Sequence, residues 1–232
     1  MSLLPLLRLQ QLADSAFPIG GAAHSFGIEA LVEERLLNTE SLARFLQDYL
    51  EESGALEAAY CAASCTLSCN GGASDESIRE WLGWNAELGA RKVARESRDG
   101  SAAMGRRFLS LAASMSEAEL LVEASETVAA CGAEVHLAAC FGFVAGTLGI
   151  DASTAAAAYL QQSMTALVSA CQRLLPLGQT HAHQILWSLK PAMLLAVERG
   201  VAESPATIRC FTPLVDLSSA RHASLYTRLF MS

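Results

Sequence analysis

Asp14-Ser-Ala-Phe-Pro-Ile-Gly-Gly-Ala-Ala-His-Ser-Phe-Gly-Ile-Glu29 interrupts an otherwise helical pattern in the first half of the chain. Pro18 restricts its own φ, and Gly20 and Gly21 permit positive φ or a close backbone approach. Leucines precede this stretch and apolar residues follow it. We therefore expect a shaped loop between two helices, with Ser25 as a plausible cap of the second.

The same glycines raise the question of phosphate binding, because glycine-rich loops before helices can hold phosphate groups. A Walker loop requires G-x-x-x-x-G-K-S/T, and neither Lys nor Arg lies between Arg8 and Arg35. A dinucleotide fingerprint requires G-x-G-x-x-G after a strand, and neither feature is found here. The stretch therefore favours a structural or partner-facing turn over nucleotide binding.

Composition indicates an all-α fold. The 232 residues include only six prolines, are rich in alanine and leucine, and contain few β-branched runs. Apolar residues recur at helical spacing, for example at Leu42, Leu46 and Leu50. We expect residues 1–232 to form a single-domain bundle of about ten helices. The formal net charge of −8 argues against nucleic-acid binding, which depends on basic surface.

Seven cysteines in a chain without a recognisable signal peptide indicate reduced thiols and a cytoplasmic location. Cys61, Cys65 and Cys69 follow one another at four-residue steps, but a closed metal site generally also draws ligands from a second element. We expect them to pack as small apolar side chains. His181 and His183 diverge on a helix because they are two residues apart. We therefore predict neither a metal site nor a cofactor.

Residues 152–172 contain no charged side chain and are long enough to cross a membrane. Alanines dominate this stretch and Gln161 and Gln162 lie in its middle, so membrane insertion would gain little. A helix buried inside a soluble bundle is the favoured interpretation. Its apolar side chains at 4-3-4 spacing need a partner helix, either within the chain or across a dimer. They are Leu160, Met164, Leu167 and Cys171.

The only basic cluster lies at residues 91–107. Within it, Met104, Phe108, Leu111 and Met115 keep a 4-3-4 spacing, so we expect the charges on the solvent side of a helix. A solvated face is the simpler interpretation. The alternative is a docking surface, which stands out because the protein as a whole is acidic.

Several positions predict helix boundaries. We expect a break or kink at Gly54, a loop and helix start at residues 70–74, a capping box at residues 116–119, and a kink at Pro191. His136 lies in an apolar segment, which is more typical of a hydrogen-bonded core histidine than of a metal ligand.

Four segments, spread from the first helix to the last residue, together resemble the urease accessory protein UreF family. They are Leu9–Gly21 with His24-Ser25, Gly27 and Glu29; Arg95-Glu96 with Met104-Gly105-Arg106; Arg173–Thr180 with Leu189 and Pro191; and Asp216–Ala223 with Tyr226–Ser232. The chain departs from the family pattern at Ala22-Ala23, where an aromatic residue is common, and at Ala182-His183, where Gly-Gln is usual.

The resemblance implies a helical, non-enzymatic assembly factor. It would join the UreD/UreH accessory protein, recruit the GTPase UreG and help load nickel into apo-urease, with nickel at most in transit through the complex. It also implies a homodimer, for which we assign the neutral surface from Leu160 to Leu174 as the dimer contact.

Site residues follow from the same resemblance and from side-chain type. Planar cations and aromatic residues are enriched at interface hot spots, and residues 211–232 are therefore expected to bind a partner. The alternative for this segment is a tail that packs onto its own domain. The expected partner-binding residues are Pro18, Gly20, Gly21, His24, Glu29, Arg221, Tyr226, Arg228, Leu229 and Phe230.

Other function classes stay open. No G-x-S-x-G or paired-carboxylate motif in a recognisable frame supports catalysis, and we predict no catalytic residue. A second hypothesis is regulation of a GTPase by an inserted arginine, either Arg221 or Arg228. A third is a helical bundle that binds a membrane or a small molecule.

Overall fold

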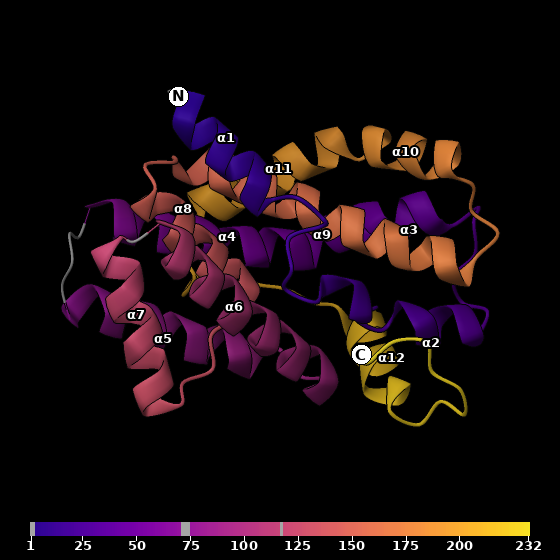
Figure 1. The fold of residues 1–232 in the computed structure, drawn as a ribbon. Helices are drawn as coiled ribbons and strands as arrows, with labels where there is room; N and C mark the ends of the chain where they lie inside the picture. Colours follow the sequence, from indigo (N-terminus) through magenta and orange to yellow (C-terminus); the bar gives the residue numbers. More distant parts are fainter. Residues whose placement is uncertain (1–2, 71–74, 117) are drawn as a thin grey trace.

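The computed structural model describes residues 3–70, 75–116 and 118–232, and these residues form an all-α fold (Figure 1). The predicted fold class is confirmed. The elements in chain order are α1 (Leu3–Leu12), η1 (Gly21–Ala23), α2 (Ile28–Glu33), α3 (Leu42–Tyr49), η2 (Leu50–Gly54), α4 (Ala55–Asn70), α5 (Asp75–Arg91), α6 (Arg95–Ser116), α7 (Glu119–Cys131), α8 (Leu137–Thr147), α9 (Ala152–Leu174), α10 (Gln179–Ser188), α11 (Lys190–Ala202) and α12 (Pro213–His222).

Helix α8 forms the centre of the bundle. It packs against α4, α6 and α9, and its residues from Leu137 to Gly146 are all buried. Gly142 and Gly146 allow this contact, because a Cβ at either position would collide with the carbonyl oxygen of Cys61 or Cys65 on α4. The two helices therefore approach each other along their backbones.

Aromatic pairs extend this core on both sides of α8. Trp81 of α5 stacks on Phe143 with ring centroids 4.6 Å apart, and Phe108 of α6 stacks on Phe141 at 5.3 Å. Phe17, in the loop after α1, packs edge-on against Phe108 at 5.4 Å. The loop is thereby anchored to the core.

The structure corrects the predicted dimer contact on α9. This helix packs against α4, α8 and α11 of its own chain. The apolar side chains assigned to the dimer are at most 4 % exposed, so they belong to the core of a single chain and cannot reach a second copy. They are Leu160, Met164, Leu167 and Cys171.

Helix boundaries follow the predictions in part. The turn at Gly54 is a π-helical segment that connects α3 to α4 without ending the helix, and Pro191 lies in the first turn of a separate helix, α11. Ala118 is the N-cap residue of α7, and no side-chain hydrogen bond caps this end of the helix. Ser116 is the last residue of α6. Glu117 of the proposed capping box, and residues 71–74 of the predicted loop and cap, lie outside the described residues.

The C-terminal end of the chain folds back onto the loop between α1 and α2. Helix α12, drawn in yellow in Figure 1, packs against α2 and α6. Residues 223–232 then run back to the loop between α1 and α2. The predicted loop and the predicted partner-binding segment are therefore in direct contact.

Candidate partner-docking site and adjoining cavity

Glu29, in the first turn of α2, holds the end of the chain. It is 6 % exposed. Its Oε1 accepts a hydrogen bond from the backbone N–H of Leu229 at 2.6 Å, and its Oε2 accepts one from the N–H of Phe230 at 3.1 Å. The same Oε2 lies 2.8 Å from Nε2 of His222. The carboxylate thus fixes two backbone amides and one side chain of the C-terminal segment, which we define as residues 211–232.

His222 links α2 to α6. Its ring is fully buried, and its Nδ1 lies 2.7 Å from Oε2 of Glu96 while its Nε2 faces Glu29. Arg228 donates to the other oxygen of Glu96 at 3.0 Å. We call Glu29, Glu96, His222 and Arg228 the C-terminal clamp.

The loop between α1 and α2, which contains Gly20 and Gly21, also binds the C-terminal segment. The carbonyl of Ser232 accepts hydrogen bonds from the N–H groups of Ser25 and Phe26 at 2.5 and 3.1 Å, and the N–H of Met231 donates to Ala23 at 2.8 Å. Nδ1 of His24 lies 2.7 Å from Oγ of Ser232. Burial lowers the pKa of His24, and the nearby charge of Arg107 lowers it further. The loop thus binds the chain's own C-terminal segment.

The outer side of the C-terminal segment is apolar and exposed. The backbone of its last residues is held by Glu29 and by the loop after α1. Exposed apolar side chains that gather on one segment are candidates for an interaction site. We call this set the outer apolar face. Its members, with exposed fractions from 47 to 103 %, are Phe211, Leu214, Leu217, Tyr226, Leu229 and Met231.

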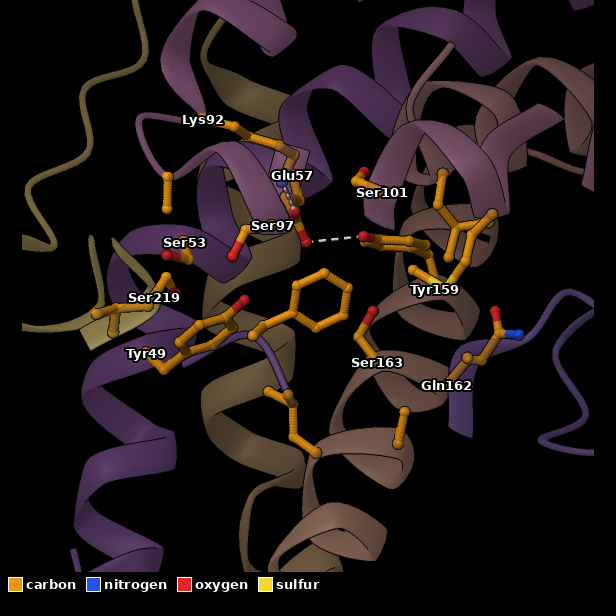
Figure 2. A pocket seen from close by; sticks show the side chains of 18 of the residues that line it. Tyr49, Ser53, Glu57, Lys92, Ser97, Ser101, Tyr159, Gln162, Ser163 and Ser219 are labelled. Atoms are coloured by element: carbon orange, nitrogen blue, oxygen red, sulfur yellow. Dashed lines mark hydrogen bonds and ion pairs between the residues drawn. The ribbon is translucent and has the colours of Figure 1, made fainter. Parts of the chain in front are cut away.

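A cavity of about 490 Å³ lies behind the C-terminal segment, and Figure 2 shows some of the side chains that line it. On one wall Lys92 pairs with Glu57 at 2.6 Å, and the hydroxyl of Tyr159 donates to the other oxygen of Glu57 at 2.7 Å. Burial alone would raise the pKa of Glu57, but the charge of Lys92 and the hydrogen bonds from Lys92 and Tyr159 together leave that pKa below its ordinary value. Burial and Glu57 raise the pKa of Tyr159. The lining thus combines a paired charge with hydroxyl groups.

A family model described as UreF matches residues 36–190, two thirds of the chain. The chain belongs to the UreF family. The matched region contains the core helices, Glu57, Lys92 and Glu96, whereas Glu29 and the C-terminal segment lie outside it.

Curated relatives extend the similarity over nearly the whole UreF-family chain. A urease accessory protein UreF of Bacillus sp. (strain TB-90) is 31 % identical over 98 % of this chain and 99 % of its own length. Those of Arthrobacter sp. (strain FB24) and Haemophilus influenzae (strain ATCC 51907) are 31 and 28 % identical, over 97 and 100 % of this chain and 96 and 97 % of their own.

Three residues predicted to contact a partner in this UreF-family chain instead contact the chain itself. His24 and Glu29 are 7 and 6 % exposed, and Phe230 is 4 % exposed beneath the guanidinium of Arg173, 4.0 Å from its ring centroid. The prediction that these three side chains contact a partner directly is therefore wrong, because the C-terminal segment covers His24 and Glu29, and Arg173 covers Phe230. The other predicted residues keep solvent contact, since Gly20 and Gly21 are half-buried and the rest are exposed. The exposed ones are Pro18, Arg221, Tyr226, Arg228 and Leu229.

Both arginines proposed as GTPase-directed groups already bind carboxylates. Arg221 lies 3.2 Å from Glu34, and Arg228 pairs with Glu96 in the clamp. An arginine that enters another active site must first leave such a contact. Both arginines are therefore engaged within the chain: Arg228 belongs to the clamp, whereas the Arg221–Glu34 pair lies at the surface.

The basic cluster at residues 91–107 is more than a solvated face. Arg91 donates to the carbonyl oxygens of Pro205 and Ile208 at 2.9 and 2.8 Å, and Arg107 donates to that of Ile19 at 3.4 Å. These bonds join α5 and α6 to distant loops, whereas Arg95 stays on the surface in a pair with Asp99. The interpretation as a purely solvent-facing surface is therefore wrong in part.

Histidine and cysteine form no metal centre within the part of the chain that the structure describes, where no group of three potential ligands is found. His181 and His183 are both exposed on α10. His136 is fully buried, yet neither ring nitrogen has a hydrogen-bond partner among the described residues, contrary to the predicted bonded histidine. Burial, with the charge of Lys92, lowers the pKa of His136 to about 4.

The long uncharged segment is α9, and it is a core helix. None of the described helices combines the length and the apolar character needed to cross a membrane. Sequence reasoning missed Glu57, Lys92 and Tyr159 as a group, and it used Glu96 only as part of the Arg95-Glu96 motif. A charged residue on an otherwise apolar helix, such as Glu57 on α4, was the one available signal.

Proposed function

We propose that this chain is a cytoplasmic urease accessory protein that works by holding other proteins in position and catalyses no reaction itself. Its partners would be the UreD/UreH accessory protein, the GTPase UreG and apo-urease, and nickel would be the cargo of the assembled complex. The outer apolar face on a clamped C-terminal segment is the observation that supports this most directly. The names of the similar curated proteins support the link to urease.

A rigid apolar face suits a scaffold because ordering a flexible tail would cost binding energy. The clamp orders the segment before any partner arrives. Burying one large apolar side chain then contributes about 1.5–3 kcal/mol. Tyr226 and Leu229 are 103 and 60 % exposed, so their burial against an apolar patch of UreD/UreH would provide the central contact.

A homodimer would need a surface other than α9, whose apolar side chains are buried. Trp187 on α10 and Leu194 and Leu195 on α11 are 78, 58 and 65 % exposed, and the two helices are in contact. We assign the dimer contact to this second apolar face. It leaves the C-terminal segment free for UreD/UreH.

Partner capture tests the proposal. Leu229→Asp places a charge on the outer apolar face, and we expect it to weaken binding of purified UreD/UreH at least tenfold in pull-down and titration experiments. Val122→Asp on α7 is the matched control, because Val122 is 40 % exposed on another part of the surface. Binding by Leu229→Asp as tight as by the wild type would contradict the proposed docking face.

Urease activation gives the second readout. In a host that lacks its own UreF, the wild type should restore nickel-dependent urease activity, and Leu229→Asp should not, at equal protein levels. Full urease activity in cells without any such protein, or substrate turnover by the purified chain alone, would refute the scaffold function.

A further inference from the structure

We propose that Arg107 and Arg173, which flank the loop between α1 and α2, dock an acidic segment of a partner protein. The loop runs between α6 and α9 (Figure 1), and each of these helices supplies one arginine to it. Nη1 of Arg107 on α6 donates to the carbonyl oxygen of Ile19 at 3.4 Å, and Nη2 of Arg173 on α9 donates to that of Ala22 at 2.6 Å. We call these two side chains the arginine pair.

The fold brings to this loop the cations that its own sequence lacks. Neither Lys nor Arg lies between Arg8 and Arg35, yet two guanidinium groups from distant helices contact the loop backbone. Gly20 makes one of these contacts possible, because it adopts a φ of 85° and a Cβ at this position would lie 2.5 Å from Nη1 of Arg107. A glycine is therefore required where Arg107 packs on the loop.

Both guanidinium groups retain open hydrogen-bond donors. The two side chains are exposed, and neither forms an ion pair with a carboxylate within residues 3–70, 75–116 and 118–232. Arg44 and Arg95, which are also exposed, pair with Asp48 and Asp99. A guanidinium carries five N–H groups in a planar fork, and the loop carbonyls occupy one group of each. The remaining donors suit the two oxygens of a carboxylate.

The elements around the loop are locally basic in an acidic protein. Met104 and Phe108 of α6 pack on Gly21 and Phe17, so the part of α6 next to the loop lies within residues 100–116. Residues 3–27, 100–116 and 152–174 together contain four arginines and one acidic residue, whereas the whole chain has 16 basic and 24 acidic residues. This local excess of positive charge favours an acidic partner. The arginines are Arg8, Arg106, Arg107 and Arg173.

Apolar neighbours favour a protein over a nucleic acid as the partner. Arg173 lies over the ring of Phe230, 4.0 Å from its centroid, and Phe230 is flanked in sequence by Leu229 and Met231, which are 60 and 69 % exposed. Arginine next to exposed apolar side chains is typical of protein–protein contacts. Nucleic-acid binding instead needs an extended basic surface, and this chain has a formal net charge of −8.

The arginine pair therefore adds a charged region next to the outer apolar face. A partner segment with two carboxylates could bind both guanidinium groups while its apolar side chains cover Leu229 and Met231. Opposite charges across such a contact speed association and select the partner, and salt weakens the contact because the arginines are exposed. The inference concerns the chemistry of the partner and holds whichever accessory protein supplies the acidic segment.

A peptide titration followed by NMR tests the proposal on the isotope-labelled full-length chain. Hexaglutamate is the probe, and hexaglutamine is its uncharged counterpart. We expect hexaglutamate to bind with a Kd of about 1 mM or below and to shift the amide signals of residues 19–23. Hexaglutamine should leave these signals unchanged. The affinity for hexaglutamate should fall about tenfold when NaCl is raised from about 20 to about 200 mM.

Substitutions locate the binding. Arg107→Gln and Arg173→Gln each remove one charge, and we expect each to weaken hexaglutamate binding about fivefold. Arg95→Gln is the matched control, because Arg95 is exposed on the same helix as Arg107 but already pairs with Asp99, and it should leave binding unchanged. Arg173→Lys keeps the charge without the planar fork, so its affinity should lie between those of Arg173→Gln and the wild type.

Four results would overturn the proposal. They are the absence of shifts in the loop at about 10 mM hexaglutamate, equal shifts with hexaglutamine, undiminished binding by both glutamine variants, and equal weakening by Arg95→Gln. The oligonucleotide hexathymidylate provides a further comparison. If it binds more tightly than hexaglutamate and loses affinity in the same variants, the surface binds nucleic acid instead.

Two features keep these results decisive. The salt dependence of the wild type decides the question if the glutamine variants do not fold, since an affinity that is unchanged by salt would exclude a charge contact. No partner protein is needed, so a failure here leaves the capture of UreD/UreH by the outer apolar face untouched.

Discussion

Replacing Glu29 by glutamine changes the clamp with almost no change in side-chain shape. Glutamine keeps one acceptor oxygen but places an NH₂ group where the other oxygen now accepts. One of the two amides, Leu229 or Phe230, then faces a donor instead of an acceptor. A hydrogen bond to a charged group contributes about 1.5–3 kcal/mol, and a buried unpaired donor adds a further cost. We expect the C-terminal segment to lose about 3 kcal/mol of local stability.

Native-state hydrogen exchange measures this effect directly. About 3 kcal/mol corresponds to a rise of roughly 100-fold in the exchange rates of the Leu229 and Phe230 amides, while the amides of α8 keep their protection. Glu34→Gln is the matched control. Glu34 contacts Arg221 of the same segment, but the two side chains are 31 and 62 % exposed, so its loss should cost no more than about 0.5 kcal/mol.

The reasoning on the clamp is refuted if the two amides exchange at wild-type rates in Glu29→Gln, or if Glu34→Gln accelerates them equally. The first result would mean that the carboxylate does not hold the segment. The second would mean that surface charge alone does. Partner binding should fall together with amide protection, because the outer apolar face depends on the ordered backbone.

Three further predictions concern the core. The pKa of His136 falls from 6.5 to about 4 on folding, so the unfolded chain binds more protons than the folded chain between these pH values. The free energy of unfolding should therefore drop by about 3 kcal/mol from pH 6.5 to pH 4. Urea titrations should show that His136→Phe flattens this dependence on pH. Gly142→Ala should cost about 3 kcal/mol or more in urea denaturation because its Cβ meets α4, whereas Gly132→Ala, whose Cβ meets nothing but whose φ is 65°, should cost about 1 kcal/mol. In thiol titration of the native protein, exposed Cys69 should react and buried Cys61, whose pKa is raised by burial, should not; equal rates would contradict the packing of α4.

Local sequence pattern was sufficient to predict the all-α class and the buried face of α3. The spacing of Leu42, Leu46 and Leu50 predicts a buried face, and all three are fully buried. Pro18 and Gly20 indicate a built loop, and Gly20 adopts a φ of 85°. Helix formation and glycine conformation depend on neighbours within a few residues, so a linear pattern records them.

The site was harder to predict because its contacts join distant residues. Glu29 belongs to the motif that suggested the family, yet it binds residues about 200 positions later. Glu57 meets Lys92 and Tyr159 across 35 and 102 positions. No local period encodes such a pairing, because it depends on how α4, the connection between α5 and α6, and α9 are placed relative to one another.

Sequence by itself determined the all-α class, the shaped loop near Gly20 and the membership suggested by four ordered motifs. Only the tertiary structure decided what covers each apolar face. Spacing shows that Leu160, Met164 and Leu167 share one side of a helix, but the same spacing serves a core or a dimer. Packing against α4, α8 and α11 buries that side within one chain, and the folded C-terminal segment turns Glu29 and Phe230 inward while leaving Tyr226 and Leu229 outside.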